Sequence, residues 1–599
     1  MGEIEFGEER LDEALKNLKM ALDIYTTFDD QAAWESLRIQ ALVGRIYYQR
    51  KKFDLARRSV DTCLLRVDKQ FTEELEMKSN LLLLRGKILA AQKNLSGAYD
   101  QFKRCLSIRK RDGKEKRSVL EVLLEIGSVL FEQEQYKLCV VYFQEALRIK
   151  KLLAETETVA SIQNQLGLSY LKLEKFHEAM RAFEEIKSFY SNSYQDVEHR
   201  QRELAHLMYN IGLAHLGLGD KDKGLSSFLD AIASFGLLQD DVKKSDKIVL
   251  ASAMYDAGVV LVENGEEKER ASSLLQKSLA LRREYMDKSS ADIADTLYTL
   301  AKMKCPESEA EEMYQMFCEA ENIYNKQDRY ERNAACLSEL GHLTVVTNMD
   351  KSLNFYKKAW AKYLAHNLDR SIEAGNILYG IGFIYNQKLD FQQAADYLKQ
   401  CLKIRIQKEG KNSLDVGKTC EQLGSCLLSM GQHEDALKLY VTSLEIYKDT
   451  YGENAVPCAR VMLDIATLYS YKQQFDLALV QLNACLGFME SHHGKDSEEV
   501  ATVLLRIGQV HDMRVDNEEA MKCVSRALEI RINLYTKEDI RVAETYLICG
   551  KVLEDWGDID EVRLFRFHYC FSRLNFVVSN LPESIPIHST RLWLAFKML

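Results

Sequence analysis

One spacing of small and bulky residues repeats along most of this chain of 599 residues. In its clearest copy, Gly167 is followed by Ala179 twelve residues later, by Phe183 sixteen later and by Ile186 nineteen later. The first residue of the spacing recurs at Gly44, Gly86, Gly127, Gly212, Gly382, Gly424, Ala466 and Gly508. A period of this length is typical of stacked units, each of which buries its apolar face against its neighbours.

Each copy of the spacing predicts two helices joined by a turn. Apolar residues follow the i, i+3, i+4, i+7 period of a helix on both sides of polar pieces such as LGDKDKG and SMGQHED. The small residues would let the two helices approach closely, and the bulky residues would fill the space between them. The chain has only 4 prolines, where average usage would give roughly 30. Because proline breaks helices, we expect an all-α fold without a sheet.

The spacing resembles the tetratricopeptide repeat, in thirteen units plus a half unit from about residue 8 to about 562. The basic repeat has about 34 residues, whereas the glycine position recurs every 42 residues from Gly382 to Gly550. The extra residues have the texture of SLEIYKDTYGENAVPCARVMLDIATLY, in which a second helix runs on and a short acidic loop leads into the next first helix. In this the chain resembles kinesin light chain and nephrocystin-type scaffold proteins. The resemblance implies a right-handed superhelical solenoid that binds peptides or proteins, in cargo attachment or in cytoskeletal and ciliary assemblies.

The sequence also departs from these relatives. A repeat begins almost at Met1, whereas kinesin light chain has a heptad segment before its repeats that docks the motor heavy chain. The asparagine that is usual two positions before the small residue is present at Asn210 and replaced elsewhere. The position after the glycine, where chaperone-binding members carry an asparagine, holds Arg45 and Lys87 in the first two full units. A clamp for a chaperone tail is therefore not expected.

The repeat pattern divides the chain into three expected segments. Residues 1–28 match the second helix of a unit without its first helix, residues 29–562 hold about thirteen units, and residues 563–599 break the pattern. The eighth unit is irregular, because Ala301 replaces the glycine and KMKCPESEA shortens the turn. The last segment is aromatic, has five Lys/Arg against one acid, and is expected to be poorly ordered. We interpret it either as a binding tail or as non-native coding sequence, and the chain as a fragment of a longer array.

The pattern predicts a protein without catalytic, cofactor or metal chemistry. The glycine-rich pieces GIGF and GLAHLGLGD lie on a helix or its turn, where they cannot form a phosphate cradle. The pair His492-His493 lies in a polar loop without a nearby cysteine. Four cysteines take the small-residue position that holds Ala146, Ala231 and Ala527 in other units: Cys63, Cys105, Cys401 and Cys485. We expect these cysteines to be buried packing residues in a reducing compartment.

Charge and hydropathy limit the expected location and partners. The net charge of −10 argues against a nucleic-acid binder, which would show a basic face. No apolar run approaches the roughly 18 to 20 residues of a membrane span, and no secretory signal is recognisable. We expect a cytoplasmic protein, and the resemblance implies an association with the cytoskeleton or the cilium.

Candidate binding residues follow from the repeat position. In such superhelices the first helix of each unit lines the concave groove, at six and three residues before the glycine and one, four and five after it. These positions give the following candidates: Arg38, Arg45, Asn80, Lys87, Tyr209, Tyr379, Phe383 and Asn386. The basic residues predict a strip for carboxylates of an acidic peptide, and the aromatic residues predict anchoring. The alternatives are ordinary solvated charges and packing between neighbouring units.

Together these features predict a non-catalytic scaffold or adaptor whose partners are proteins or peptides. Two alternatives stay open at this point. One is a motor-cargo adaptor of the kinesin light chain type, and the other is a regulatory subunit that binds and controls an enzyme.

Overall fold

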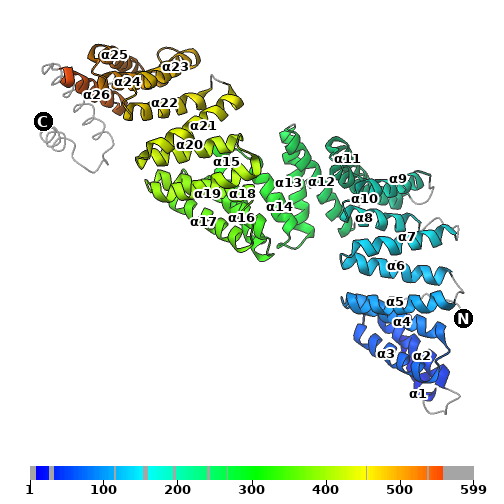
Figure 1. Ribbon diagram of the computed structural model, residues 1–599. Coiled ribbons are helices and arrows are strands. Elements are labelled where there is room, and N and C mark those ends of the chain that lie inside the picture. The colour runs from blue at the N-terminus through cyan, green and yellow to red at the C-terminus, as the bar shows by residue number, and fades with distance from the viewer. Residues whose placement is uncertain are drawn as a thin grey trace, which may run out of the picture. The chain divides into compact units, whose positions relative to one another are not determined.

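The computed structural model describes residues 8–25, 33–112, 116–152, 159–192, 197–238, 243–265, 267–452, 455–535 and 539–556. Within these ranges every regular element is an α-helix (Figure 1). The expected fold class, an all-α array of helical hairpins, is therefore confirmed. The segment 563–599, expected to form an atypical tail, lies outside the described residues. The chain divides after Met303 into two compact units.

The first unit contains α1 to α14, in which each helix packs against the next one along the chain. The bounds are α1 (Glu8–Tyr25), α2 (Ala33–Gln49), α3 (Phe53–Gln70), α4 (Leu75–Ala91), α5 (Leu95–Asp112), α6 (Lys116–Glu132), α7 (Tyr136–Leu152), α8 (Val159–Lys172), α9 (Phe176–Asn192), α10 (Val197–Gly217), α11 (Lys221–Gly236), α12 (Lys244–Asn264), α13 (Lys268–Tyr285) and α14 (Ala291–Met303). The first helices of successive hairpins also touch, as α4 touches α6 and α10 touches α12. These even-numbered helices therefore form the inner side of the stack.

The second unit contains α15 to α26 and is stacked in the same way. The bounds are α15 (Pro306–Lys326), α16 (Tyr330–Thr344), α17 (Met349–Ala365), α18 (Ile372–Gln387), α19 (Phe391–Glu409), α20 (Leu414–Ser429), α21 (His433–Tyr451), α22 (Val456–Tyr471), α23 (Phe475–His493), α24 (Glu498–Met513), α25 (Asn517–Leu534) and α26 (Ile540–Trp556). As in the first unit, even-numbered helices such as α20, α22 and α24 are the first helices of the hairpins.

The boundary between the units falls in the hairpin that the sequence shows as irregular. Helix α14 ends at Met303, and α15 begins at Pro306 after two residues. Proline is tolerated in the first turn of a helix, because its missing N–H would have no partner there. Inside α15, Glu309 has non-helical backbone angles, φ −126° and ψ 19°. The short KMKCPESEA turn thus lies at the boundary between the two units.

Serine caps fix the beginning of three helices in the second unit. The hydroxyl oxygens of Ser371, Ser413 and Ser497 accept hydrogen bonds from backbone N–H groups in the first turn of α18, α20 and α24. Each serine is followed within two residues by an acidic residue, which interacts favourably with the positive end of the helix. The sequence therefore sets these helix starts locally.

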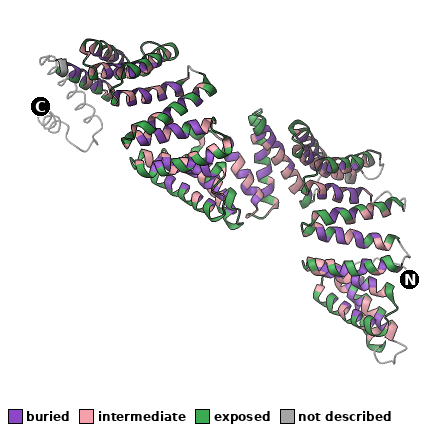
Figure 2. Ribbon diagram, in the orientation of Figure 1, coloured by how far each residue is buried: buried purple, intermediate pink, exposed green. Residues whose placement is uncertain are grey.

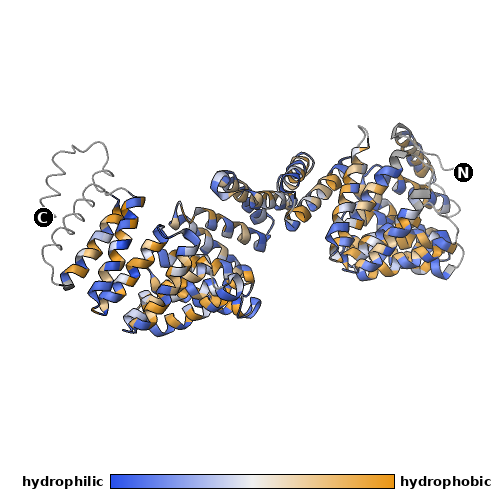
Figure 3. Cartoon of the chain, turned by 90° about the horizontal axis from the view of Figure 1, so that it is seen from above, coloured by the Kyte–Doolittle hydropathy of each residue, from blue (hydrophilic) through white to orange (hydrophobic). Residues whose placement is uncertain are grey.

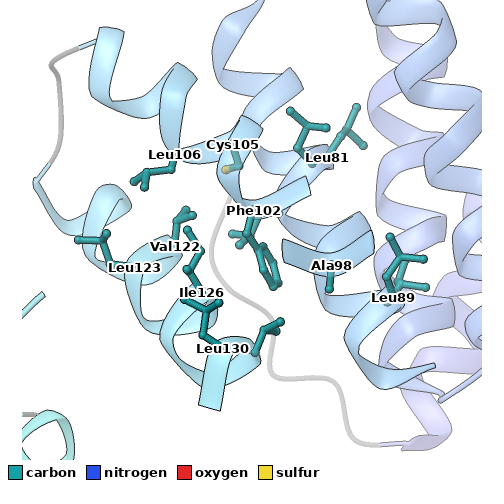
Figure 4. Packing of buried hydrophobic residues seen from close by; sticks show 14 of the residues in the cluster. Leu81, Leu89, Ala98, Phe102, Cys105, Leu106, Val122, Leu123, Ile126 and Leu130 are labelled. Carbon is teal, nitrogen blue, oxygen red and sulfur yellow. The ribbon is translucent and has the colours of Figure 1, made fainter. Parts of the chain in front are cut away.

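The core of each unit lies between successive hairpins, and buried residues run along one side of each helix (Figure 2). Hydrophobic and hydrophilic residues alternate around the helices in the same way (Figure 3). Figure 4 shows the part formed by α4, α5 and α6, where Leu81, Phe102 and Ile126 are fully or almost fully buried. The four cysteines in the small-residue position, Cys63, Cys105, Cys401 and Cys485, are fully buried free thiols, as the sequence predicts.

Among the helices of the described residues, none combines the length and the apolar composition that crossing a bilayer requires.

Candidate functional site

The inner side of the first unit contains a pocket of about 580 Å³, which we call the first-helix pocket. It is lined by Arg38, Ala41, Leu42, Arg45, Tyr48, Gln49, Met77, Asn80, Leu81, Leu83, Leu84, Lys87, Arg109 and Glu121. Most of these residues belong to α2 and α4, the first helices of two successive hairpins. The structure therefore brings together all four polar candidates from these two units, Arg38, Arg45, Asn80 and Lys87.

The first-helix pocket is basic, although the whole chain is acidic. Four cations line it, namely Arg38, Arg45, Lys87 and Arg109, and the only carboxylate among its lining residues is that of Glu121. Glu35 and Glu125, which pair with Arg38 and Lys87 from outside the lining, reduce the excess to one positive charge. Arg38 is exposed and lies 3.1 Å from Glu35 on its own helix, and a surface pair of this kind contributes little to stability. Arg45 is exposed, and it has no ion-pair partner among the described residues.

Lys87 differs from the other cations because two carboxylates already bind it. Its Nζ lies 2.9 Å from Glu121 Oε1 and 3.3 Å from Glu125 Oε1. Burial lowers the pKa of Lys87, but the hydrogen bonds and charges of Glu121 and Glu125 outweigh it and raise the pKa above its usual value. Lys87 is therefore charged at neutral pH, and a carboxylate arriving from a partner would compete with Glu121.

Asn80 is held in place by a residue that the sequence did not single out. Arg109, from the second helix α5, is only 8% exposed and donates from Nη2 to Asn80 Oδ1 at 2.9 Å. The position count used for the other candidates applies to first helices and so could not find Arg109. The same count applied to Gly127 gives Glu121, the acidic member of the pocket.

Tyr209, the predicted aromatic anchor on α10, has its hydroxyl engaged inside the first unit. It is half-buried and donates a hydrogen bond to Asp256 Oδ2 at 3.0 Å. Burial and the Asp256 carboxylate raise the pKa of Tyr209 above its usual value, so that the phenol stays protonated and remains a donor. Burial in turn raises the pKa of Asp256 to about 6, against the lowering effects of the Tyr209 hydrogen bond and of Arg282.

The remaining candidates lie on α18 in the second unit, and each is half-buried. The guanidinium of Arg405 lies over the ring of Tyr379, 4.8 Å from its centre. Phe383 packs against the core cluster that includes Leu353 and Ile377. Asn386 donates to Gln422 Oε1 at 3.4 Å. Their use as anchors for a partner stays a prediction.

The chemistry of the described side chains is that of packing and recognition. Burial raises the pKa of the Cys105 and Cys485 thiols to about 11, which disfavours the reactive thiolate. Among the described residues, no group of three or more His, Cys, Asp or Glu side chains is arranged to hold a metal ion. The first-helix pocket combines cations, an amide and apolar side chains, a set suited to a peptide with acidic and apolar residues.

Three stretches of the chain match family models described as "Tetratricopeptide repeat". One model matches residues 118–192 and 415–491, and a second matches residues 375–405. The matched stretches lie in both units. They agree with the repeat spacing in the sequence and with the helical hairpins of the structure.

Two curated plant proteins from Arabidopsis thaliana are similar to parts of the chain. Protein KINESIN LIGHT CHAIN-RELATED 2 is 25% identical over 155 residues, which are 26% of this chain and 23% of that protein. Protein KINESIN LIGHT CHAIN-RELATED 3 is 24% identical over 184 residues, 30% of this chain and 28% of that protein. The matches thus span about a quarter of the length of these relatives.

Among solved structures, similar chains include BtubC (BKLC) from P. vanneervenii, at 18% identity and a TM-score of 0.34. That match covers 40% of this chain and 96% of BtubC. The apo form of the quorum sensor NprR from B. thuringiensis is 15% identical with a TM-score of 0.42, and it covers 59% of this chain and 99% of that one.

Proposed function

Because this chain is built of tetratricopeptide repeats, we propose that it is a non-catalytic scaffold or adaptor that holds a segment of another protein in the first-helix pocket. Repeat solenoids present extended surfaces suited to binding other proteins. The observation that carries the proposal is the meeting of Arg38, Arg45 and Lys87 around one pocket that also has apolar walls. The buried free thiols fit a reducing compartment such as the cytoplasm.

The charge of the pocket favours an acidic segment as the ligand. A local excess of cations on a chain of net charge −10 attracts carboxylates and repels basic partners. Arg45 has no competing carboxylate among the described residues, so it is the cation most available to a ligand. Leu42, Met77 and Leu84 provide apolar contacts beside it. The ligand class is therefore an extended peptide with acidic residues and at least one large apolar residue.

The proposal is tested with the full chain and a short fluorescent peptide of Asp, Glu and Leu residues. In the variant Arg38→Glu/Arg45→Glu the ion pairs of Lys87 are left intact, and we expect the affinity to fall by about tenfold or more. The matched control Arg58→Glu/Lys69→Glu makes the same charge change on exposed positions of the second helix α3. It should bind within about twofold of the unmodified chain. Equal losses in both variants, at unchanged helical circular dichroism, would show a general charge effect and reject the pocket.

The names of the plant relatives favour one finer function, that of an adaptor between a kinesin motor and its cargo. The segments that match span about a quarter of those relatives. Co-purification of the full chain with kinesin heavy chain tests this second candidate. Recovery of the heavy chain at a fixed ratio would favour it, and recovery of cytoskeletal or ciliary proteins without the motor would favour the general scaffold.

A further inference from the structure

A second pocket of about 580 Å³ lies in the first unit where the ends of α5 and α7 meet the start of α6. It is lined by Arg109, Lys110, Lys116, Val119, Val141, Gln144, Glu145, Arg148, Ile149 and Leu152. We call it the second-helix pocket, because most of its residues belong to the second helices α5 and α7. The two pockets share only Arg109. None of the residues that line the second-helix pocket lies at a groove position counted from the glycine.

The second-helix pocket has cations that the fold does not use. Lys110 lies 2.8 Å from Glu145, and Arg109 is occupied by Asn80 and the backbone carbonyl of Ser118. Lys116 and Arg148 are both exposed, and neither has an ion-pair partner among the described residues. Glu145 pairs with Lys110, and Glu121 pairs with Arg109 at 3.4 Å, which leaves an excess of two positive charges, those of Lys116 and Arg148. An anion bound here would neutralise charge that the folded chain leaves unpaired.

Apolar side chains at the same place narrow the class of ligand. Val141 is 57% exposed and Leu152 is 62% exposed, and both line the pocket together with Ile149. Solvent-exposed aliphatic side chains beside free cations favour a ligand that offers apolar groups as well as negative charge. None of the lining residues is aromatic, so the pocket lacks the stacking platforms typical of single-stranded nucleic-acid sites.

The concave shape of the second-helix pocket favours a protein segment over a membrane surface as its ligand. A bilayer is flat on this scale and is contacted by protruding apolar side chains, whereas a hollow accepts a side chain from the partner. We propose that the second-helix pocket is a second docking site, which binds an acidic segment of a partner protein by placing large aliphatic side chains of that segment against Val141 and Leu152, which lie eleven residues apart on α7. Lys116 and Arg148 receive the carboxylates that flank these side chains.

The site would make the first unit bivalent. One partner segment occupies the first-helix pocket and another occupies the second-helix pocket, so that two acidic segments bind the same unit at the same time. Linking two sites raises the apparent affinity for a ligand that can reach both, without any new contact. An acidic scaffold with two local basic pockets thereby selects partners that carry two separated acidic segments.

The test uses the full chain and the fluorescent peptide of Asp, Glu and Leu described above. In Lys116→Glu/Arg148→Glu we expect the affinity of the second-helix site to fall by about tenfold or more, so that fewer peptides are bound at the peptide concentration that just fills both sites of the unmodified chain. The matched control Lys172→Glu/Lys175→Glu makes the same charge change on the exposed last residue of α8 and on an exposed residue just before α9, and it should keep both sites. Equal binding by the variant and the control would overturn the proposal.

Three further measurements distinguish the ligand classes. Val141→Ser/Leu152→Ser should weaken the site for the leucine peptide but not for a peptide in which serine replaces leucine. Hydrogen exchange with bound peptide should slow in residues 141–152, and slowing confined to residues 38–49 would reject the site. Flotation with vesicles of phosphatidylserine and phosphatidylcholine should recover little protein. Charge-dependent flotation without peptide binding would mean that the patch contacts a membrane, and would overturn the proposal.

Peptide binding by the Arg38→Glu/Arg45→Glu variant distinguishes a failure of the first-helix pocket from a failure of the second-helix pocket. If only the first-helix pocket binds peptide, that variant loses all binding and Lys116→Glu/Arg148→Glu loses none. If only the second-helix pocket binds, the pattern is reversed.

Discussion

At the scale of single residues, the glycine of the first helix has no side chain, and this leaves room for a phenylalanine ring of the second helix. A Cβ placed on Gly127 would lie 2.6 Å from carbons of the Phe143 ring, far inside van der Waals contact. The same glycine and phenylalanine, sixteen residues apart, meet at Gly86, Gly167 and Gly212. The ring fills the space above the glycine, and this explains why small and bulky residues recur together in the sequence.

We expect Gly127→Ala to destabilise the first unit by roughly 1–3 kcal/mol, because the added methyl group forces the buried Phe143 ring out of its position. Thermal unfolding followed by circular dichroism measures the effect as a lower Tm. Gly236→Ala is the control in the same unit, since its added Cβ would meet nothing within 4 Å. The control should be neutral or slightly stabilising. A Tm for Gly127→Ala equal to that of the control would contradict the proposed packing.

Asp256 is a second residue whose surroundings determine its contribution, in this case to the pH dependence of the free energy of unfolding. Burial raises its pKa from 3.8 to about 6, so between about pH 4 and 6 the folded chain holds a proton that the unfolded chain releases. Because the folded state binds more protons in this window, the free energy of unfolding falls as the pH rises through it. The full effect corresponds to at most roughly 3 kcal/mol.

Asp256→Asn should remove this pH dependence, since the amide oxygen can still accept the hydrogen bond from Tyr209. Relative to the unmodified chain, the variant should gain about 2 kcal/mol of stability between pH 4.5 and pH 7.5, measured by denaturant unfolding. The exposed Asp222→Asn, in the same unit, is the control and should show no such gain. An unchanged pH profile in Asp256→Asn would mean that the carboxyl is ionised throughout this range.

At the scale of helices, buried arginines join one hairpin to the next. Arg405 at the end of α19 donates from Nη1 to the Asp415 carbonyl at 2.8 Å and to Thr419 Oγ1 at 2.7 Å, both on α20. Its Nη2 donates to Asn376 on α18 at 2.7 Å. The same bonds, to a carbonyl ten residues on and a threonine fourteen residues on, are made by Arg282 and Arg531. A repeated arginine and threonine, fourteen residues apart, therefore mark the junction between neighbouring repeats.

Replacing Arg405 should weaken this junction. In Arg405→Met the aliphatic stem remains, but the Asp415 carbonyl and the Asn376 amide lose their partner, at a cost of roughly 2–4 kcal/mol. Lys403→Met, an exposed position on the same helix, should stay within about 0.5 kcal/mol of the unmodified chain. Hydrogen exchange in α19 and α20 gives the measurement. Faster exchange in both variants, or in neither, would show that the arginine does not join the helices.

At the scale of the whole molecule, the chain is two repeat stacks in succession. The stability of such stacks is approximately a sum of unit terms and nearest-neighbour terms, so a change at Gly127 and a change at Arg405 act in different units and should be additive. Charge is also distributed unevenly at this scale. The chain carries −10, yet cations outnumber carboxylates in both pockets of the first unit. Electrostatic selection of partners therefore depends on local patches rather than on net charge.

The helical hairpins, their period and the burial of the small-residue positions could be predicted from the sequence, because helix formation and core packing follow local spacing. The sequence also predicts that Arg38, Arg45, Asn80 and Lys87 lie on one side, since their positions repeat from unit to unit. The binding of Lys87 by Glu121 and Glu125 and the hydrogen bond between Tyr209 and Asp256 could not be predicted. These contacts join different hairpins, and how side chains meet there depends on the stacking of helices. Lys116 and Arg148 lie on the two helices of one hairpin, and their place in one pocket depends on how those helices pack. Periodicity within one helix specifies neither arrangement.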